Sequence, residues 1–161
     1  MVLQIVALEQ RHLDKILTDS PCNLITPAAL GQAYFSPGSV AYCLLADGEP
    51  VFAAGIVNLQ WQRGEAWLLS TAFFRQHVKT CFRILREWLP AVAASGKFIR
   101  VQVTCKDGFS EKLIERLGFE REATLRCFGP RGETCSMYAR FFPGDVAPGW
   151  VDRAPVQVAS A

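Results

Sequence analysis

The chain has 161 residues, half of them hydrophobic, which is enough to bury the core of one domain but too few for two ordinary ones. Its 17 basic and 15 acidic residues give a net charge of +2, which excludes a protein that binds nucleic acid or membranes through overall charge. No basic N-terminal stretch leads into a long apolar run, so we expect no secretion signal, no membrane span and a cytoplasmic location.

The apolar patterns of the first half predict four strands, over residues 2–8, 39–46, 51–60 and 66–70. A polar-faced helix is expected over 9–17, and Thr26-Pro27 indicates the start of a second helix that runs toward Phe35. Asp47-Gly48 favours a tight hairpin turn, and residues 62–65 indicate the next turn.

In the second half the apolar period becomes helical from Ala72 to about Ala94, which predicts one long helix. A strand follows over 98–104, so the strand before the helix and the strand after it should run parallel. Asp107-Gly108 opens a further helix, which Gly118 ends as a left-handed C-cap. The last two strands, over 119–128 and 133–142, form a hairpin.

These patterns predict one α/β domain over residues 1–142, with a mixed, mostly antiparallel sheet of about seven strands flanked by helices. Residues 143–161 form a Pro/Gly-rich tail without a core of its own.

None of the six cysteines stand two to four residues apart as zinc ligands would, so we expect no metal site and reduced thiols. Cys127 and Cys135 are equidistant from Arg131, and a symmetric hairpin would place them opposite each other. They would be two packed thiols in a cytoplasm, or a disulfide in an oxidising compartment.

The stretch from Ser110 to Glu120, SEKLIERLGFE, resembles the helix that ends in LYEKLGF in the GNAT (Gcn5-related N-acetyltransferase) family. The leucine seals the core, the glycine reverses the helix and the phenylalanine starts the next strand. The order of elements over residues 1–142 is similar to the GNAT fold as well. The resemblance implies a protein that transfers an acetyl group from acetyl-CoA to an amine.

Three positions depart from the family pattern. GNAT enzymes hold the CoA pyrophosphate in an Arg/Gln-x-x-Gly-x-Gly/Ala loop, which corresponds here to Arg75, Gln76, His77, Val78, Lys79 and Thr80. Val78 and Thr80 replace the glycines, and their branched side chains should crowd the phosphate. Ile114 replaces the tyrosine that protonates the CoA thiolate, and Asp107 replaces an asparagine at the start of that helix.

A divergent branch shares these losses, namely the GNAT-like internal virion proteins of short-tailed phages, which are needed in particle assembly. The chain is similar to them over roughly residues 40–142, in a Trp-containing strand over 66–70, a basic main helix and the degenerate loop. This resemblance implies phage structural proteins as partners and a place in the virion.

The candidate catalytic residues are Glu65, as a base on a central strand, and His77, as a base beside the degenerate loop. The favoured alternatives are, for Glu65, a turn residue that pairs with Arg63 and, for His77, a histidine with a purely structural role. For His12 a structural role is favoured more strongly.

Candidate partner-binding residues are the basic stripe of the main helix and an anchor in the tail: Arg75, Lys79, Arg83, Arg86 and Trp150. A solvated helix face is the favoured alternative for the stripe.

Three functions follow, in this order of preference. The first is a catalytically silent GNAT-fold protein that serves as a phage virion-associated or assembly module and needs no cofactor. The second is an atypical acetyl-CoA-dependent N-acetyltransferase. The third is a binder of anionic ligands or nucleic acid through the basic helix face.

Overall fold

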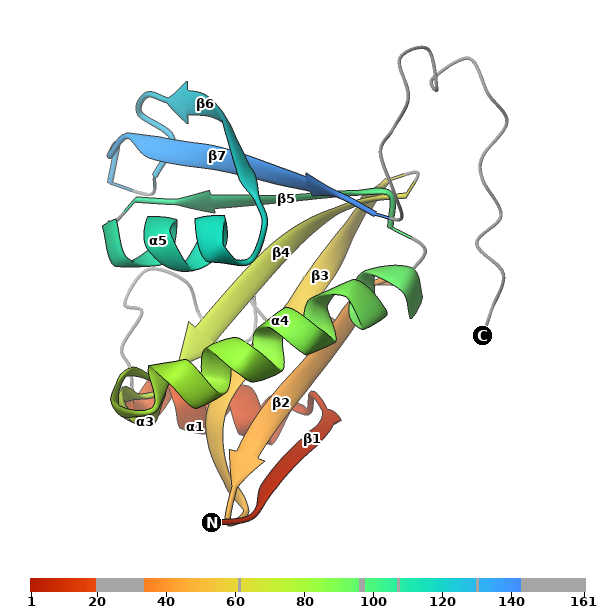
Figure 1. The fold of residues 1–161 in the computed structure, drawn as a ribbon, viewed down its shortest axis with the longest axis vertical. Coiled ribbons are helices and arrows are strands. Elements are labelled where there is room, and N and C mark those ends of the chain that lie inside the picture. Colours follow the sequence, from red (N-terminus) through yellow and green to blue (C-terminus); the bar gives the residue numbers. More distant parts are fainter. Residues whose placement is uncertain (20–33, 61, 96–97, 107, 130, 143–161) are drawn as a thin grey trace.

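The computed structural model is a seven-stranded sheet with helices on both faces (Figure 1). It describes residues 1–19, 34–60, 62–95, 98–106, 108–129 and 131–142. The tail over 143–161, with Trp150, and nearly all of the helix predicted from Thr26-Pro27 toward Phe35 lie outside the described residues.

The first half contains the predicted strands and the first predicted helix. Their bounds are β1 (Leu3–Ala7), α1 (Gln10–Asp19), β2 (Val40–Ala46), β3 (Glu49–Gln60) and β4 (Arg63–Ser70). Asp47 and Gly48 have φ angles of 49° and 86°, as the predicted tight turn requires. Strand β4 begins three residues earlier than predicted, so Glu65 lies inside the strand and the prediction that it belongs to a turn is wrong.

The second half follows the predicted order with one extra break. Its elements are α3 (Ala72–Gln76), α4 (Val78–Ser95), β5 (Arg100–Cys105), α5 (Gly108–Arg116), β6 (Glu120–Leu125) and β7 (Cys135–Phe141). The expected single helix from Ala72 to Ala94 is interrupted at His77, whose φ of −119° and ψ of 30° are not helical. The short α3 places Phe74 in the core, edge-on to Phe52 at 5.7 Å between ring centroids.

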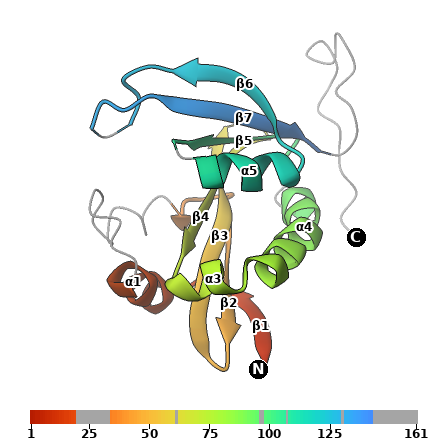
Figure 2. The same ribbon diagram turned by 60° about the vertical axis from the view of Figure 1, so that its left-hand side comes forward.

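The strands are ordered β1-β2-β3-β4-β5-β7-β6, and every neighbouring pair is antiparallel except β4 and β5. The parallel pair confirms the crossover predicted through the long helix. Helices α4 and α5 cover one face of the sheet and α1 covers the other, as Figure 2 shows. The prediction of a mixed, mostly antiparallel sheet of seven strands is confirmed.

The core lies mainly between the sheet and helices α4 and α5. Leu89, Val92 and Phe98 pack there against Val101 and Tyr138, and a smaller cluster beneath α1 contains Leu13 and Ile16. Burial of these apolar side chains is the main favourable contribution to folding.

Gly64 lets β4 approach the core closely. A Cβ atom at Gly64 would lie 2.2 Å from Cγ2 of Ile56 and 2.9 Å from the ring of Phe98, so a larger residue does not fit. This close packing holds the first residues of β4 against β5.

The β6–β7 hairpin differs from the symmetric one expected from the sequence. Leu125, not Cys127, lies opposite Cys135, because Arg126 and Cys127 leave the ladder before the turn. Cys127 is exposed with a φ of 53°, Cys135 is buried, and both are free thiols. The prediction that these two cysteines face each other is therefore wrong.

Candidate active site

Strands β4 and β5 pair at only three positions and then separate. Arg63, Gly64 and Glu65 lie beside Arg100, Val101 and Gln102, and no later residue of β4 pairs with β5. The two strands diverge from this point toward their carboxyl ends, as Figures 1 and 2 show. The sheet therefore has a V-shaped opening whose apex is at Glu65 and Gln102.

Glu65 is the titratable side chain nearest this apex on β4. It is half-buried, and its carboxylate is hydrogen-bonded to the side chain of Gln102. Burial raises the pKa of the Glu65 carboxyl, and the hydrogen bond from Gln102 partly opposes that rise. A carboxylate that is more basic than usual can accept a proton near neutral pH.

Aromatic side chains lie beside Glu65 on the face of the sheet that α1 covers. Trp67 follows Glu65 by two residues, so both point to this face, and the ring of Tyr34 stacks on the indole at 3.6 Å between centroids. Gly55 on β3 leaves room for the indole, since a Cβ there would lie 3.0 Å from Trp67 Cζ2. The surroundings of Glu65 on this face are therefore largely apolar.

The degenerate loop forms the end of α3 and the first turn of α4. Arg75 and Gln76 are exposed on α3, and Lys79 is exposed on α4. Val78 packs against the core cluster that contains Phe74, so its side chain is turned toward the interior. The expected crowding of a phosphate by Val78 is therefore wrong.

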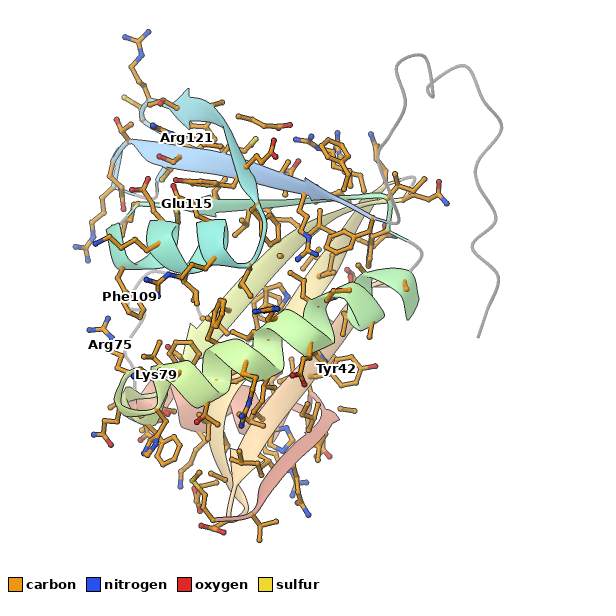
Figure 3. All side chains as sticks on the ribbon, viewed as in Figure 1. Tyr42, Arg75, Lys79, Phe109, Glu115 and Arg121 are labelled. Atoms are coloured by element: carbon orange, nitrogen blue, oxygen red, sulfur yellow. The ribbon has the colours of Figure 1, made fainter. Side chains whose placement is uncertain are left out.

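Arg75 lies next to Phe109 at the open end of the V. The guanidinium carbon is 5.9 Å from the centroid of the Phe109 ring, and the two side chains point toward each other from α3 and α5 in Figure 3. Phe109 is 49% exposed at the start of α5. Phe109 could not be singled out from the sequence, because its partner Arg75 lies 34 residues earlier in the chain.

His77, the second candidate base, lies far from Glu65. It joins α3 to α4, and its ring stacks on Phe73 at 4.1 Å between centroids. Ser70, at the end of β4, is five residues beyond Glu65, which is roughly 16 Å at the usual rise per residue. The structure therefore does not bring the two candidate catalytic residues together.

Ile114 is a residue of α5 whose side chain lies in the core. It is 8% exposed and packs with Leu89 and Phe119. It has no proton to donate. Tyr138, on strand β7, belongs to the same core cluster as Ile114, and its hydroxyl donates a hydrogen bond of 3.4 Å to Glu115 Oε1.

The basic stripe is exposed, as predicted, but it is divided. Arg75 lies on α3, whereas Lys79, Arg83 and Arg86 lie on α4 beyond the break at His77. None of the ion pairs among the described residues uses these four cations.

His12 has the structural role favoured from the sequence. It is 5% exposed, and its Nδ1 accepts a hydrogen bond of 3.1 Å from the Glu9 N–H at the start of α1. Burial lowers the pKa of His12, so the ring is held in its neutral form.

Neither a metal cluster nor a membrane span is found in the part of the chain that the structure describes. Groups of three or more metal-ligating side chains do not occur there. No helix there combines the length and the apolar character that crossing a bilayer requires.

No family model matches the sequence, and no curated protein matches it either. Solved structures do match, and they define the chain as a GNAT-fold α/β protein. A provisionally assigned phosphinothricin N-acetyltransferase has a TM-score of 0.74 and 14% identity, over 89% of this chain and 100% of its own.

Two further structures give the same result. A chimera of the spermidine N-acetyltransferase SpeG from Vibrio cholerae and hSSAT has a TM-score of 0.70 and 12% identity, over 86% of this chain and 95% of its own. An acetyltransferase of the GNAT family from Streptococcus pneumoniae has a TM-score of 0.67 and 12% identity, over 88% of this chain and 100% of its own. At these identities the likeness concerns the fold.

The start of α4 fits the anionic part of an acyl-CoA through charge. Lys79 is an exposed cation in the first turn of the 18-residue helix α4, where the helix dipole also favours negative charge, and Arg75 is an exposed cation three residues before that helix, on α3. The glycines that would let backbone N–H groups surround a phosphate are absent. These residues would therefore hold the group by side-chain charge, and more weakly than a glycine loop would.

Proposed function

We propose that the chain is an acyl-CoA-dependent N-acyltransferase in which Glu65 is the general base. The observation that supports this most is the position of Glu65, a half-buried carboxylate at the apex where β4 and β5 separate. Burial raises the pKa of this carboxyl, as a base that works near neutral pH requires. A purely structural glutamate gains nothing from such a site.

In the proposed reaction Glu65 accepts a proton from the nitrogen of an amine acceptor on the face that α1 covers. When bound, an acyl-CoA supplies the activated acyl group that is transferred to this nitrogen. Arg75 and Lys79 would hold the anionic end of the acyl-CoA at the start of α4. Ile114 provides no acid, so the departing thiolate takes its proton from solvent.

The test is a thiol-release assay with acetyl-CoA and a panel of amines. Spermidine and phosphinothricin are natural first acceptors, because structural neighbours carry the names of acetyltransferases for them. We expect Glu65→Gln to lower kcat/KM about 100-fold or more, as loss of a general base does. Glu49→Gln is the matched control, since Glu49 is an exposed glutamate on the neighbouring strand β3 that pairs with Lys15.

The second candidate is the catalytically silent assembly module that the sequence favoured. It is supported by Ile114 in place of a proton donor and by the exposed cations Arg75, Lys79, Arg83 and Arg86, which suit an acidic partner. A phage virion protein as that partner remains a proposal, as does a nucleic acid.

These candidates are separated by charge reversal. Replacing Arg83 and Arg86 with glutamate, which changes neither of the cations assigned to the acyl-CoA, should abolish partner binding in the second case and leave turnover intact in the first. No turnover with any amine, together with lost binding in the reversed variant, would favour the assembly module.

A further inference from the structure

The side chains of Glu65 and Gln102 form the last cross-strand pair before β4 and β5 separate. The proposed function assigns Glu65 a proton-transfer role but does not say what orients its carboxylate. Resting on that function, we propose that Gln102 is a positioning residue that holds the Glu65 carboxylate toward the acceptor.

The ladder dictates the pairing. Glu65 and Gln102 are direct partners in the parallel register, so their side chains leave the sheet on the same face and at the same level. Both are half-buried, and they are hydrogen-bonded to each other. Beyond this level β5 no longer flanks β4, so no later residue of β5 could take the place of Gln102.

An amide suits this role better than a cation would. An arginine or lysine beside Glu65 would stabilise the carboxylate strongly and make it a weak base. The amide of Gln102 donates a neutral hydrogen bond, which fixes the orientation of the carboxylate and opposes only part of the effect of burial. The base is thus ordered without losing its basicity.

Charged neighbours do not provide an alternative partner. Arg63, two residues before Glu65 on the same face, is exposed. Arg100, two residues before Gln102, is bound by Glu122 at 2.5 Å. On β3, the partner of Glu65 is Val57, and Lys15 of α1 pairs with Glu49.

The experiment is a pH titration of the full chain labelled with ¹³Cδ-glutamate, in which the Glu65→Gln variant identifies the Glu65 resonance. Gln102→Met removes the donor and keeps the length of the side chain. We expect the midpoint of Glu65 to move upward in this variant. Thr104→Val, a change on the same face of β5 two residues later, should leave the midpoint in place.

Kinetics give the second measurement. At pH values above the Glu65 midpoints of both proteins, where the carboxylate is ionised in each, Gln102→Met should still lower kcat/KM about tenfold, because the carboxylate is no longer held toward the acceptor. If Gln102→Met does not fold, Gln102→Leu is used instead, and it should also move the Glu65 midpoint upward because it lacks the amide donor.

The failures of the two proposals can be told apart. A Glu65 midpoint that stays in place or moves down in the Gln102 variants overturns the role of Gln102. A protein that titrates as expected but transfers no acyl group to any amine overturns the proposed function.

Discussion

Glu65 and Gln102 face each other across the last rung of the parallel β4–β5 ladder and are joined by a side-chain hydrogen bond. Their residues are 37 positions apart in the chain, and the crossover through α4 brings them together. The half-buried carboxylate of Glu65 destabilises the fold when it is ionised. The pH dependence of the unfolding free energy therefore reports on this site without any measurement of turnover.

The first prediction concerns the stability of Glu65→Gln. Burial raises the pKa of Glu65 in the folded chain, so the folded state binds this proton more tightly than the unfolded state. Unfolding free energy should therefore fall as pH rises from 4.5 through the raised pKa. Denaturant unfolding at pH 5 and pH 8 should show that Glu65→Gln removes this loss and is the more stable protein at pH 8.

Glu122→Gln is the matched variant with the opposite sign. The hydrogen bond from Arg100 lowers the pKa of Glu122 in the folded chain. The ionised carboxylate therefore stabilises the fold at pH values above the ordinary pKa of a glutamate, and this stability is lost as pH falls through the lowered pKa. Its loss should cost up to about 1 kcal/mol at pH 8, because the pair is partly exposed. Equal effects of both variants would contradict the assignment of a costly buried charge to Glu65.

The second prediction concerns His12. Burial lowers its pKa, so the unfolded chain takes up the proton first as pH falls, and stability should decrease below pH 6.5. His12→Gln keeps an acceptor for the Glu9 N–H and should flatten this dependence, whereas His12→Ala should cost about 1 kcal/mol at pH 8. Thermal unfolding between pH 5 and pH 8 measures both effects. A stability difference between wild type and His12→Gln that stays constant over this range would show that His12 is not held neutral.

Sequence patterns predicted the elements well, because their signals are local. The Asp47-Gly48 turn and the Gly118 C-cap, whose φ is 86°, depend on residues within one turn of each other. The break at His77 could not be predicted in this way, since the apolar period runs through it without interruption.

Within the candidate site, only part was predictable. Glu65 could be proposed from the sequence as a carboxylate near a central strand, but Gln102 and Phe109 could not. Their importance comes from partners on distant elements, Glu65 on β4 and Arg75 on α3, that only the folded sheet brings close. The inward orientation of Val78 also required the structure, because its contact with the Phe74 cluster cannot be read from the loop pattern.

The third prediction concerns the packing of β4 against the core. Gly64→Ala would place a Cβ 2.2 Å from Ile56 Cγ2, so it should destabilise the protein by roughly 1–3 kcal/mol, as overpacking does. Gly108→Ala is the control, since nothing lies within 4 Å of its Cβ at the start of α5. That change should be neutral or stabilising by up to about 1 kcal/mol. Two variants of equal stability in urea would contradict the close approach at Gly64.

The last prediction concerns acetyl-CoA. We expect its dissociation constant to be above about 1 μM, because side-chain charge replaces the backbone N–H groups that a glycine loop would offer. Isothermal titration should show that Arg75→Ala and Lys79→Ala each weaken binding about threefold to tenfold at low salt. Both effects should shrink at high salt, since the two cations are exposed. Arg86→Ala is the matched control, because Arg86 is an exposed cation two turns further along α4. Binding tighter than this, or a loss in Arg86→Ala equal to that in Lys79→Ala, would show that the cofactor is not held at the start of α4 in the way proposed.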